Sequence, residues 1–176
     1  MTTIKYIDIK TPLGNMTAAA TRKGICLLEF NNGERVKNEF EDLMKIFDAG
    51  AKEGGNMHLN LLKKELDEYF ARNRKEFTVS LDIPGSDFQI KVWEQILLIP
   101  YGKTISYKEQ AEAMGNADAV RAVAHANGQN RVSIVIPCHR VIGSNGKLVG
   151  YGGGLPKKKW LIDFEKGISA NQPGLF

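Results

Sequence analysis

The sequence predicts a protein of the α/β (α+β) class, with a small N-terminal sheet-plus-helix domain (residues 1–82) and a mainly helical C-terminal domain (residues 86–170). Three observations predict this. Strand-like runs precede amphipathic helical runs in the first half, Ile83-Pro84-Gly85 interrupts the pattern, and short helices joined by a glycine turn follow. We therefore expect a linker near residue 84 and a winged helix-turn-helix after it.

Hydrophobic periodicity places the elements of the first domain. Apolar runs separated by turn residues predict strands at residues 4–9, 16–21 and 24–30. Apolar residues at helical spacing predict amphipathic helices over residues 34–47 and 59–70. A last strand is expected at residues 77–81, just before the linker.

The second domain begins with clear helix signals. Ser86 and Asp87 are good N-cap residues for a first helix, and Ser106 caps a short helix that runs through residue 114. Gly115-Asn116 turns the chain, and a second short helix follows over residues 118–126. Such a pair forms a helix-turn-helix or an ordinary helical hairpin, and the sequence leaves both open.

The second helix of this pair is rich in alanine, with Arg121 projecting among small residues. A slim helix can enter a groove of DNA, and it can equally pack tightly against a neighbouring helix. Farther on, Ser144-Asn145-Gly146 lies between apolar arms and predicts a hairpin over residues 141–149, which would be the wing. Pro156 opens a last helix, which Gly167 closes.

Composition and charge narrow the class of protein. The chain has 176 residues, 43% hydrophobic and 25% charged, as in ordinary globular proteins. Its net charge of +4 lies in the second half, because residues 1–84 carry 13 basic and 13 acidic side chains whereas residues 85–176 carry 11 and 7. A polyanion such as DNA would bind there. No apolar run is long enough for a membrane span and residues 1–10 lack a signal-peptide core, so we expect a cytoplasmic protein without a membrane partner.

The most informative motif is Ile-Pro-Cys-His-Arg-Val at residues 136–141. It places Cys138 after a rigid proline, beside an imidazole and near the permanent charge of Arg140. Nearby cationic charge lowers a thiol pKa and favours the reactive thiolate. A buried, inert thiol is the alternative, because free cysteine often fills a core, as we expect for Cys26.

Together these residues resemble the O6-alkylguanine-DNA alkyltransferases, also called methylated-DNA–protein-cysteine methyltransferases. The match covers about residues 86–167, and the first half matches more loosely through Thr11-Pro12-Leu13-Gly14. The matching pieces, in family order, are Phe88-Gln89, Val92-Trp93, Ile99-Pro100-Tyr101-Gly102, Ser106-Tyr107, Arg121-Ala122-Val123, residues 127–130, Pro137-Cys138-His139-Arg140-Val141, Gly150-Tyr151, Lys158 and Glu165.

The resemblance implies a ribonuclease-H-like first domain and a DNA repair activity. The protein would bind double-stranded DNA through the minor groove, flip out an alkylated base and accept its alkyl group on Cys138. The lesion would be O6-alkylguanine, with O4-alkylthymine left open. We expect a monomer without a cofactor, and each molecule would react once because a thioether does not readily hydrolyse.

The resemblance also assigns roles to individual residues. Cys138 would be the nucleophile, His139 its base through a bridging water, and Glu165 the group that orients the imidazole. Tyr107 would donate a hydrogen bond to the departing guanine, and Asn130 would tie the turn between the recognition helix and an extended strand that carries Cys138. Without the resemblance, His139 could equally make a structural hydrogen bond, and Glu165 could lie at a solvated helix end.

The remaining predicted site residues surround this group. Val149, Tyr151 and Gly152 would line the base pocket, and some relatives carry serine at the position of Gly152. Arg121 would fill the gap left in the base stack, with a plain phosphate contact as the alternative. DNA contacts are also expected from Tyr107, Lys108, Asn116 and Ser144.

Three other functions and a metal site fit these residues less well. An alkyl-base sensor of this family would lack the reactive cysteine, a cysteine hydrolase would need an oxyanion hole, and a transcription regulator would bind a defined DNA sequence. Only Cys26 and His58 in the first domain have typical Cys/His zinc-ligand chemistry, too few for a closed site, so no metal is expected.

Overall fold

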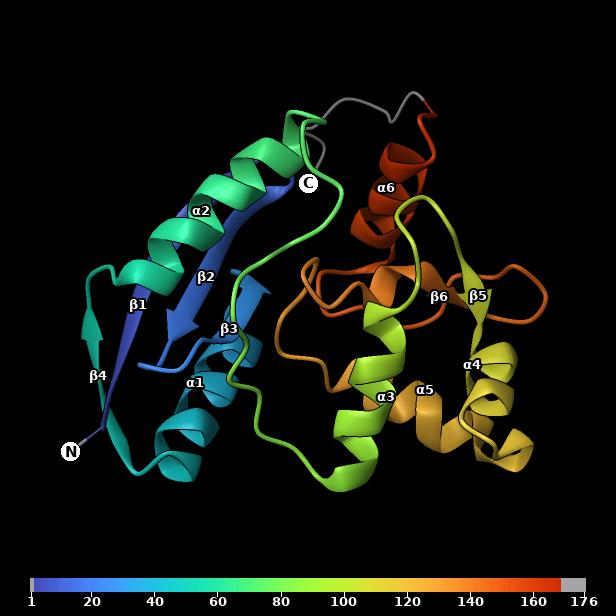
Figure 1. Ribbon diagram of the computed structural model, residues 1–176, viewed down its shortest axis with the longest axis horizontal. Helices are drawn as coiled ribbons and strands as arrows, with labels where there is room; N and C mark the ends of the chain where they lie inside the picture. Colours follow the sequence, from blue (N-terminus) through green and yellow to red (C-terminus); the bar gives the residue numbers. More distant parts are fainter. Residues whose placement is uncertain (1, 169–176) are drawn as a thin grey trace. The chain divides into compact units, whose positions relative to one another are not determined.

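The computed structural model describes residues 2–168. The chain forms two compact units, Met1–Pro84 and Gly85–Phe176, each with its own internal packing (Figure 1). Within residues 2–168, no helix is both long enough and apolar enough to cross a membrane.

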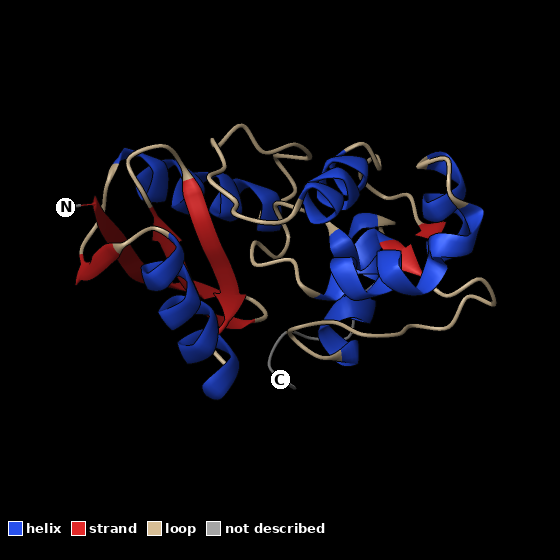
Figure 2. Ribbon diagram, turned by 90° about the horizontal axis from the view of Figure 1, so that it is seen from below, coloured by secondary structure: helices blue, strands red, loops and turns tan. Residues whose placement is uncertain are grey.

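The first unit is built on a four-stranded sheet in the order β3-β2-β1-β4. Strands β1 (Thr2–Thr11), β2 (Gly14–Ala20) and β3 (Ile25–Phe30) are antiparallel neighbours, whereas β4 (Ala49–Glu53) pairs parallel with β1. Helices α1 (Glu34–Ile46) and α2 (Met57–Phe70) pack on this sheet, and Figure 2 shows helices on both of its sides. Every residue of β3 is buried, as expected for a strand covered on both faces.

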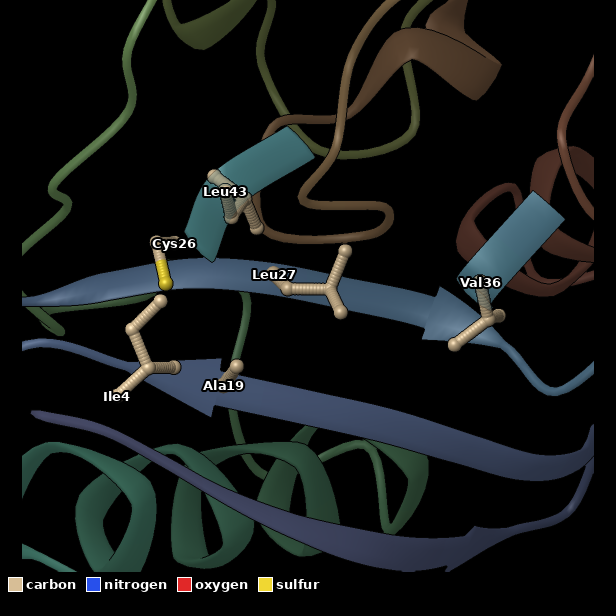
Figure 3. Close-up of a cluster of buried hydrophobic side chains, with 6 residues drawn as sticks. All are labelled: Ile4, Ala19, Cys26, Leu27, Val36 and Leu43. Atoms are coloured by element: carbon tan, nitrogen blue, oxygen red, sulfur yellow. The ribbon is translucent and has the colours of Figure 1, made fainter. Parts of the chain in front are cut away.

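One hydrophobic cluster joins the sheet to α1 (Figure 3). Ile4, Ala19 and Leu27 come from three neighbouring strands, and Val36 and Leu43 reach them from α1. Cys26 lies in the same cluster and is fully buried, which fits the inert core thiol that the sequence suggested.

The predicted strands and helices of this unit form with small shifts at their ends, but two predictions were wrong. Strand β4 was not expected, because Ala-Gly-Ala-Lys-Glu has weak strand propensity and forms only by pairing with β1. The strand expected at residues 77–81 is reduced to one bridge between Ile25 and Leu81. Ser80 lies so close to Gly24 that a side chain on Gly24 would collide with it.

The second unit is mainly helical. A capping box formed by Ser86 and Gln89 starts α3 (Asp87–Leu97), and a second one formed by Ser106 and Glu109 starts α4 (Tyr107–Ala113). Gly115, with φ of 78°, makes the turn into a 3-10 turn (Ala117–Ala119) that continues as α5 (Val120–Gly128). The predicted pair of short helices is therefore present, with the second α-helix shifted by two residues.

The last elements carry the motif around Cys138. A 3-10 helix (Cys138–Arg140) leads into β6 (Val141–Ile142), which pairs parallel with β5 (Ile105–Ser106) just before α4. Helix α6 (Leu155–Glu165) closes the described chain, with Pro156 in its first turn.

The predicted wing is present only as its turn. The Gly143 N–H donates to the Lys147 carbonyl at 2.8 Å, and the Gly146 N–H donates to the Gly143 carbonyl at 2.9 Å. Within residues 141–149, all of which the structure describes, no antiparallel ladder joins the two arms, because Val141–Ile142 pairs with β5 instead.

Candidate active site

Cys138 is held at the edge of the second unit by the side chain of Asn130. The Asn130 amide donates to Cys138 Sγ at 3.3 Å and to the Ile136 carbonyl at 2.9 Å, while its oxygen accepts the Val132 N–H at 2.9 Å. Asn130 itself is buried, whereas Cys138 is partly exposed. The Asn130 amide thus fixes the position of a thiol that is partly exposed.

The backbone at Cys138 differs from the expected extended strand. Cys138–Arg140 is a 3-10 turn, closed by the Arg140 N–H donating to the Pro137 carbonyl at 2.9 Å. The alternation of adjacent side chains expected for an extended segment therefore does not apply. The residues before Pro137 form turns, and the Asn130 side chain is hydrogen-bonded to the backbone of Val132 and Ile136 there.

His139 is fully buried next to Glu165 of α6. Its Nε2 lies 2.7 Å from Glu165 Oε1, so the carboxylate fixes the orientation of the ring. Among the described residues, His139 Nδ1 is buried and has no hydrogen-bond partner. Burial lowers the pKa of His139, and the charges of Arg140 and Lys158 lower it further, while Glu165 opposes them.

Glu165 is the centre of a buried charge network. Arg140 donates to it through Nε at 2.8 Å and through Nη2 at 2.9 Å, and the Gly102 N–H donates at 3.2 Å. Burial alone would raise the pKa of Glu165, but His139 and Arg140 outweigh burial and hold this pKa far below its ordinary value. Glu165 is therefore a carboxylate, not the solvated helix end that was the alternative.

A second polar group lies around Tyr107 at the start of α4. The Tyr107 hydroxyl donates to the Val149 carbonyl at 3.0 Å and accepts a hydrogen bond from Lys158 Nζ at 3.2 Å. Lys158 also donates to the carbonyls of Val149 at 2.9 Å and Gly150 at 3.3 Å. Burial raises the pKa of Tyr107 to about 12, with a further contribution from the charge of Cys138.

Lys158 is fully buried. Burial lowers the pKa of Lys158 to about 8, although Cys138 opposes this shift. The sequence singled out Lys158 only as part of a family pattern and gave it no role. Its position on the same face of α6 as Glu165, seven residues later, is the signal that could have placed both in one site.

The other predicted site residues lie on the surface of the same unit. Arg121 is exposed in the first turn of α5 and Lys108 is exposed on α4, where it pairs with Glu112 at 4.0 Å. Asn116 and Ser144 are exposed in the two turns, while Tyr151 and Gly152 are half-buried before α6. The carbonyl of Val149 is tied into the Tyr107 group, although its side chain is half exposed.

The described residues hold no group of three or more His, Cys, Asp or Glu side chains that could bind a metal ion. The chemistry available is that of a thiol, an imidazole, a phenol and an ammonium group. A cysteine that is partly exposed, next in sequence to an imidazole oriented by a carboxylate, is an arrangement for nucleophilic attack.

Comparison with known proteins assigns the family. A model described as "6-O-methylguanine DNA methyltransferase, DNA binding domain" matches residues 87–167, and one described as the ribonuclease-like domain of the same proteins matches residues 4–83. The chain belongs to the methylated-DNA–protein-cysteine methyltransferase family. This membership accounts for both halves of the molecule.

Individual members of the family are similar over nearly the whole chain. A methylated-DNA–protein-cysteine methyltransferase of Mycobacterium bovis is 53% identical over 165 residues, 93% of each protein. The inducible enzyme of Bacillus subtilis is 39% identical over 156 residues, which are 89% of this chain and 87% of that protein. The crystal structure of Mycobacterium tuberculosis OGT in complex with DNA superposes with a TM-score of 0.76 over 94% of this chain and 93% of that one, at 38% identity.

Proposed function

We propose that this protein repairs DNA by transferring the alkyl group of O6-alkylguanine to Cys138. The observation that carries the proposal is the partly exposed Cys138 thiol next to the buried pair of His139 and Glu165. In the transfer, a bond forms between Sγ and the alkyl carbon while the bond between that carbon and O6 breaks. The electron pair of the broken bond leaves with the guanine.

His139 serves as the base for Cys138. In the neutral ring, Nε2–H donates to Glu165, which leaves Nδ1 as the nitrogen that can accept a proton. Nδ1 has no partner among the residues that the structure describes, so it is available for the thiol proton. Glu165 then stabilises the imidazolium, and the thiolate carries out the attack.

Tyr107 and Lys158 stabilise the departing base. Negative charge develops on the guanine as the alkyl group leaves, and the Tyr107 hydroxyl can donate a hydrogen bond to it. Lys158 hydrogen-bonds the same hydroxyl, and its positive charge favours both the thiolate and the leaving base. Val149, Tyr151 and Gly152 line the pocket that accepts the purine.

The lesion reaches this site by base flipping. A guanine O6 lies inside the duplex, so the nucleotide must leave the stack before Cys138 can touch it. The α4–α5 pair lies in the minor groove, with Arg121 inserted in the vacated space and with Lys108, Asn116 and Ser144 on the backbone. Backbone contacts carry no sequence information, which suits a protein that must find a lesion anywhere.

The reaction is a single turnover by a monomer in the cytoplasm. Cys26 and Cys138 are both thiols, as in a reducing compartment. None of the described residues near Cys138 offers chemistry that would cleave a thioether. O4-alkylthymine is a second candidate substrate, since it presents the same alkyl carbon to the same sulfur.

Peptide mapping after incubation with an O6-methylguanine duplex tests the proposal. We expect one added CH₂ on the peptide that contains Cys138 and none on the peptide with the buried Cys26, which serves as an internal control. Cys138→Ser must abolish the transfer while it leaves duplex binding intact. A folded protein that leaves Cys138 unmodified refutes the proposal, and hydrolysis of a small acyl ester would instead indicate a cysteine hydrolase.

Arg121 is tested separately by two substitutions. If the side chain fills the base stack, both Arg121→Ala and Arg121→Lys lower the transfer rate on a duplex and leave labelling by free O6-benzylguanine unchanged. If it only contacts a phosphate, the lysine variant behaves as the wild type, because lysine keeps the charge.

A further inference from the structure

Arg140 is turned into the protein and is only 6% exposed. Besides its two bonds to Glu165, it donates through Nη1 to the Ile99 carbonyl at 2.6 Å and lies over the Tyr101 ring at 5.8 Å. The sequence suggested that this cation acts on the thiol of Cys138. Instead, its charge is matched by the carboxylate that also holds His139.

This sharing has an electrostatic consequence. A carboxylate paired with His139 alone would favour the imidazolium, because an opposite charge at this distance stabilises the charged ring. With Arg140 bound through two nitrogens, Glu165 and Arg140 together carry no net charge, and His139 faces a balanced pair. The remaining bond from the Gly102 N–H further occupies the carboxylate.

We propose that Arg140 is a positioning residue that neutralises Glu165 and thereby keeps the buried His139 imidazole uncharged and ready to take the proton of Cys138. The inference rests on the proposed role of His139 as the base. It assigns Arg140 a function that is distinct from fixing the loop at Ile99 and from acting on the thiol directly.

The other charged groups around His139 are consistent with this balance. Glu165 and Lys158 act on it from α6 and Arg140 acts on it from its own 3-10 turn, in which Cys138 precedes it. Tyr107 is hydrogen-bonded to Lys158. Glu165 favours the charged ring, whereas Arg140 and Lys158 disfavour it. Arg140 also contacts Glu165 directly.

NMR titration of the His139 imidazole in the full chain without DNA tests the inference. Arg140→Met removes the charge, and we expect the pKa of His139 to rise by about one unit or more. Arg140→Lys keeps the charge with a poorer fit, so the rise must be much smaller. The signal of His125, which is exposed on α5, serves as the internal reference.

A second neutral variant, with a polar side chain, covers the case in which Arg140→Met does not fold. Arg140→Gln keeps a donor for Glu165 without the charge, and it must raise the pKa of His139 as the methionine variant does. If the neutral variants are folded and His139 titrates as in the wild type, Arg140 is merely structural and the inference is wrong.

The rate of alkyl transfer supplies an independent reading. Loss of the Arg140 charge raises the pKa of the His139 imidazole, so the acid limb of the rate profile in Arg140→Gln should move to higher pH. A wild-type protein that transfers no alkyl group refutes the proposed function and leaves the titration result standing. An unshifted His139 refutes only the role of Arg140.

Discussion

Replacement of Asn130 is the perturbation with the most direct structural consequence. Asn130→Ala removes two backbone hydrogen bonds of 2.9 Å, to Ile136 and from Val132, together with the contact to Cys138 Sγ. Each buried bond contributes about 1 to 1.5 kcal/mol, and an unsatisfied buried partner costs about 1 to 3 kcal/mol. We therefore expect the free energy of unfolding to fall by about 2 to 4 kcal/mol.

The aspartate variant isolates the electrostatic part of the same site. Asn130→Asp keeps the shape and the acceptor for Val132 N–H but turns the donor toward Sγ into an acceptor. A carboxylate at that distance disfavours the thiolate and raises the thiol pKa by about one to three units. The rate of alkyl transfer near neutral pH should fall by about 10-fold to 1000-fold and recover as the pH is raised.

Two assays measure these effects. Urea unfolding gives the stability change, with the exposed Asn73→Ala as a control that should stay within about 0.5 kcal/mol of the wild type. Single-turnover transfer from an O6-methylguanine duplex, followed across pH, gives the rate. An Asn130→Asp protein that reacts at the wild-type rate at pH 7 would refute the reasoning, as would an Asn130→Ala protein as stable as the Asn73 control.

Other predictions follow from the buried charges and the turn at Gly102. Glu165→Gln leaves Arg140 buried without its counter-charge and should lower the free energy of unfolding, measured in urea, by about 3 to 5 kcal/mol. Because the pKa of Glu165 is lowered in the folded protein, the stabilisation by Glu165 is present above the ordinary carboxyl pKa of 4.5 and is lost as the pH falls below it. Burial lowers the pKa of Lys158 from 10.5 to about 8, so the unfolded chain binds more protons than the folded chain between these two pH values. The stability of the wild type relative to Lys158→Met should therefore rise from about pH 8 to pH 10.5. A stability difference that does not change with pH would contradict the assignment. Gly102→Ala combines a φ of 77° with a Cβ 3.0 Å from the Glu165 carbonyl, whereas Gly115→Ala meets a φ of 78° and open space. Thermal unfolding should therefore show the larger loss for Gly102→Ala, and equal losses would mean that the contact with Glu165 is unimportant.

Periodicity and capping residues were enough to predict most helices and strands. Ser86 and Ser106 begin helices through capping boxes, as their side chains allow. Local signals failed where pairing over long distances decides the structure. β4 forms because it pairs in parallel with the edge of β1. Val141–Ile142 pairs with β5 and not with the other arm of the predicted hairpin.

In the candidate site, too, local sequence predicted some features, whereas contacts between distant segments decided the others. The Cys-His-Arg motif pointed to a reactive thiol, and the structure brings His139 and Glu165 together as expected. The partner of Arg140 could not be read from the motif, because Glu165 lies 25 residues away on another element. The burial of Lys158 beside Tyr107 likewise depends on the packing of α6, which no local pattern specifies.

The stoichiometry of transfer tests the central claim most directly. A fixed amount of protein is incubated with a large excess of O6-methylguanine duplex, and repaired guanine is counted together with methylated protein. The account predicts that repair stops at one methyl group per chain, all of it on Cys138. Repair that continues past one equivalent, or that stops at one with the methyl group on another residue, would contradict it.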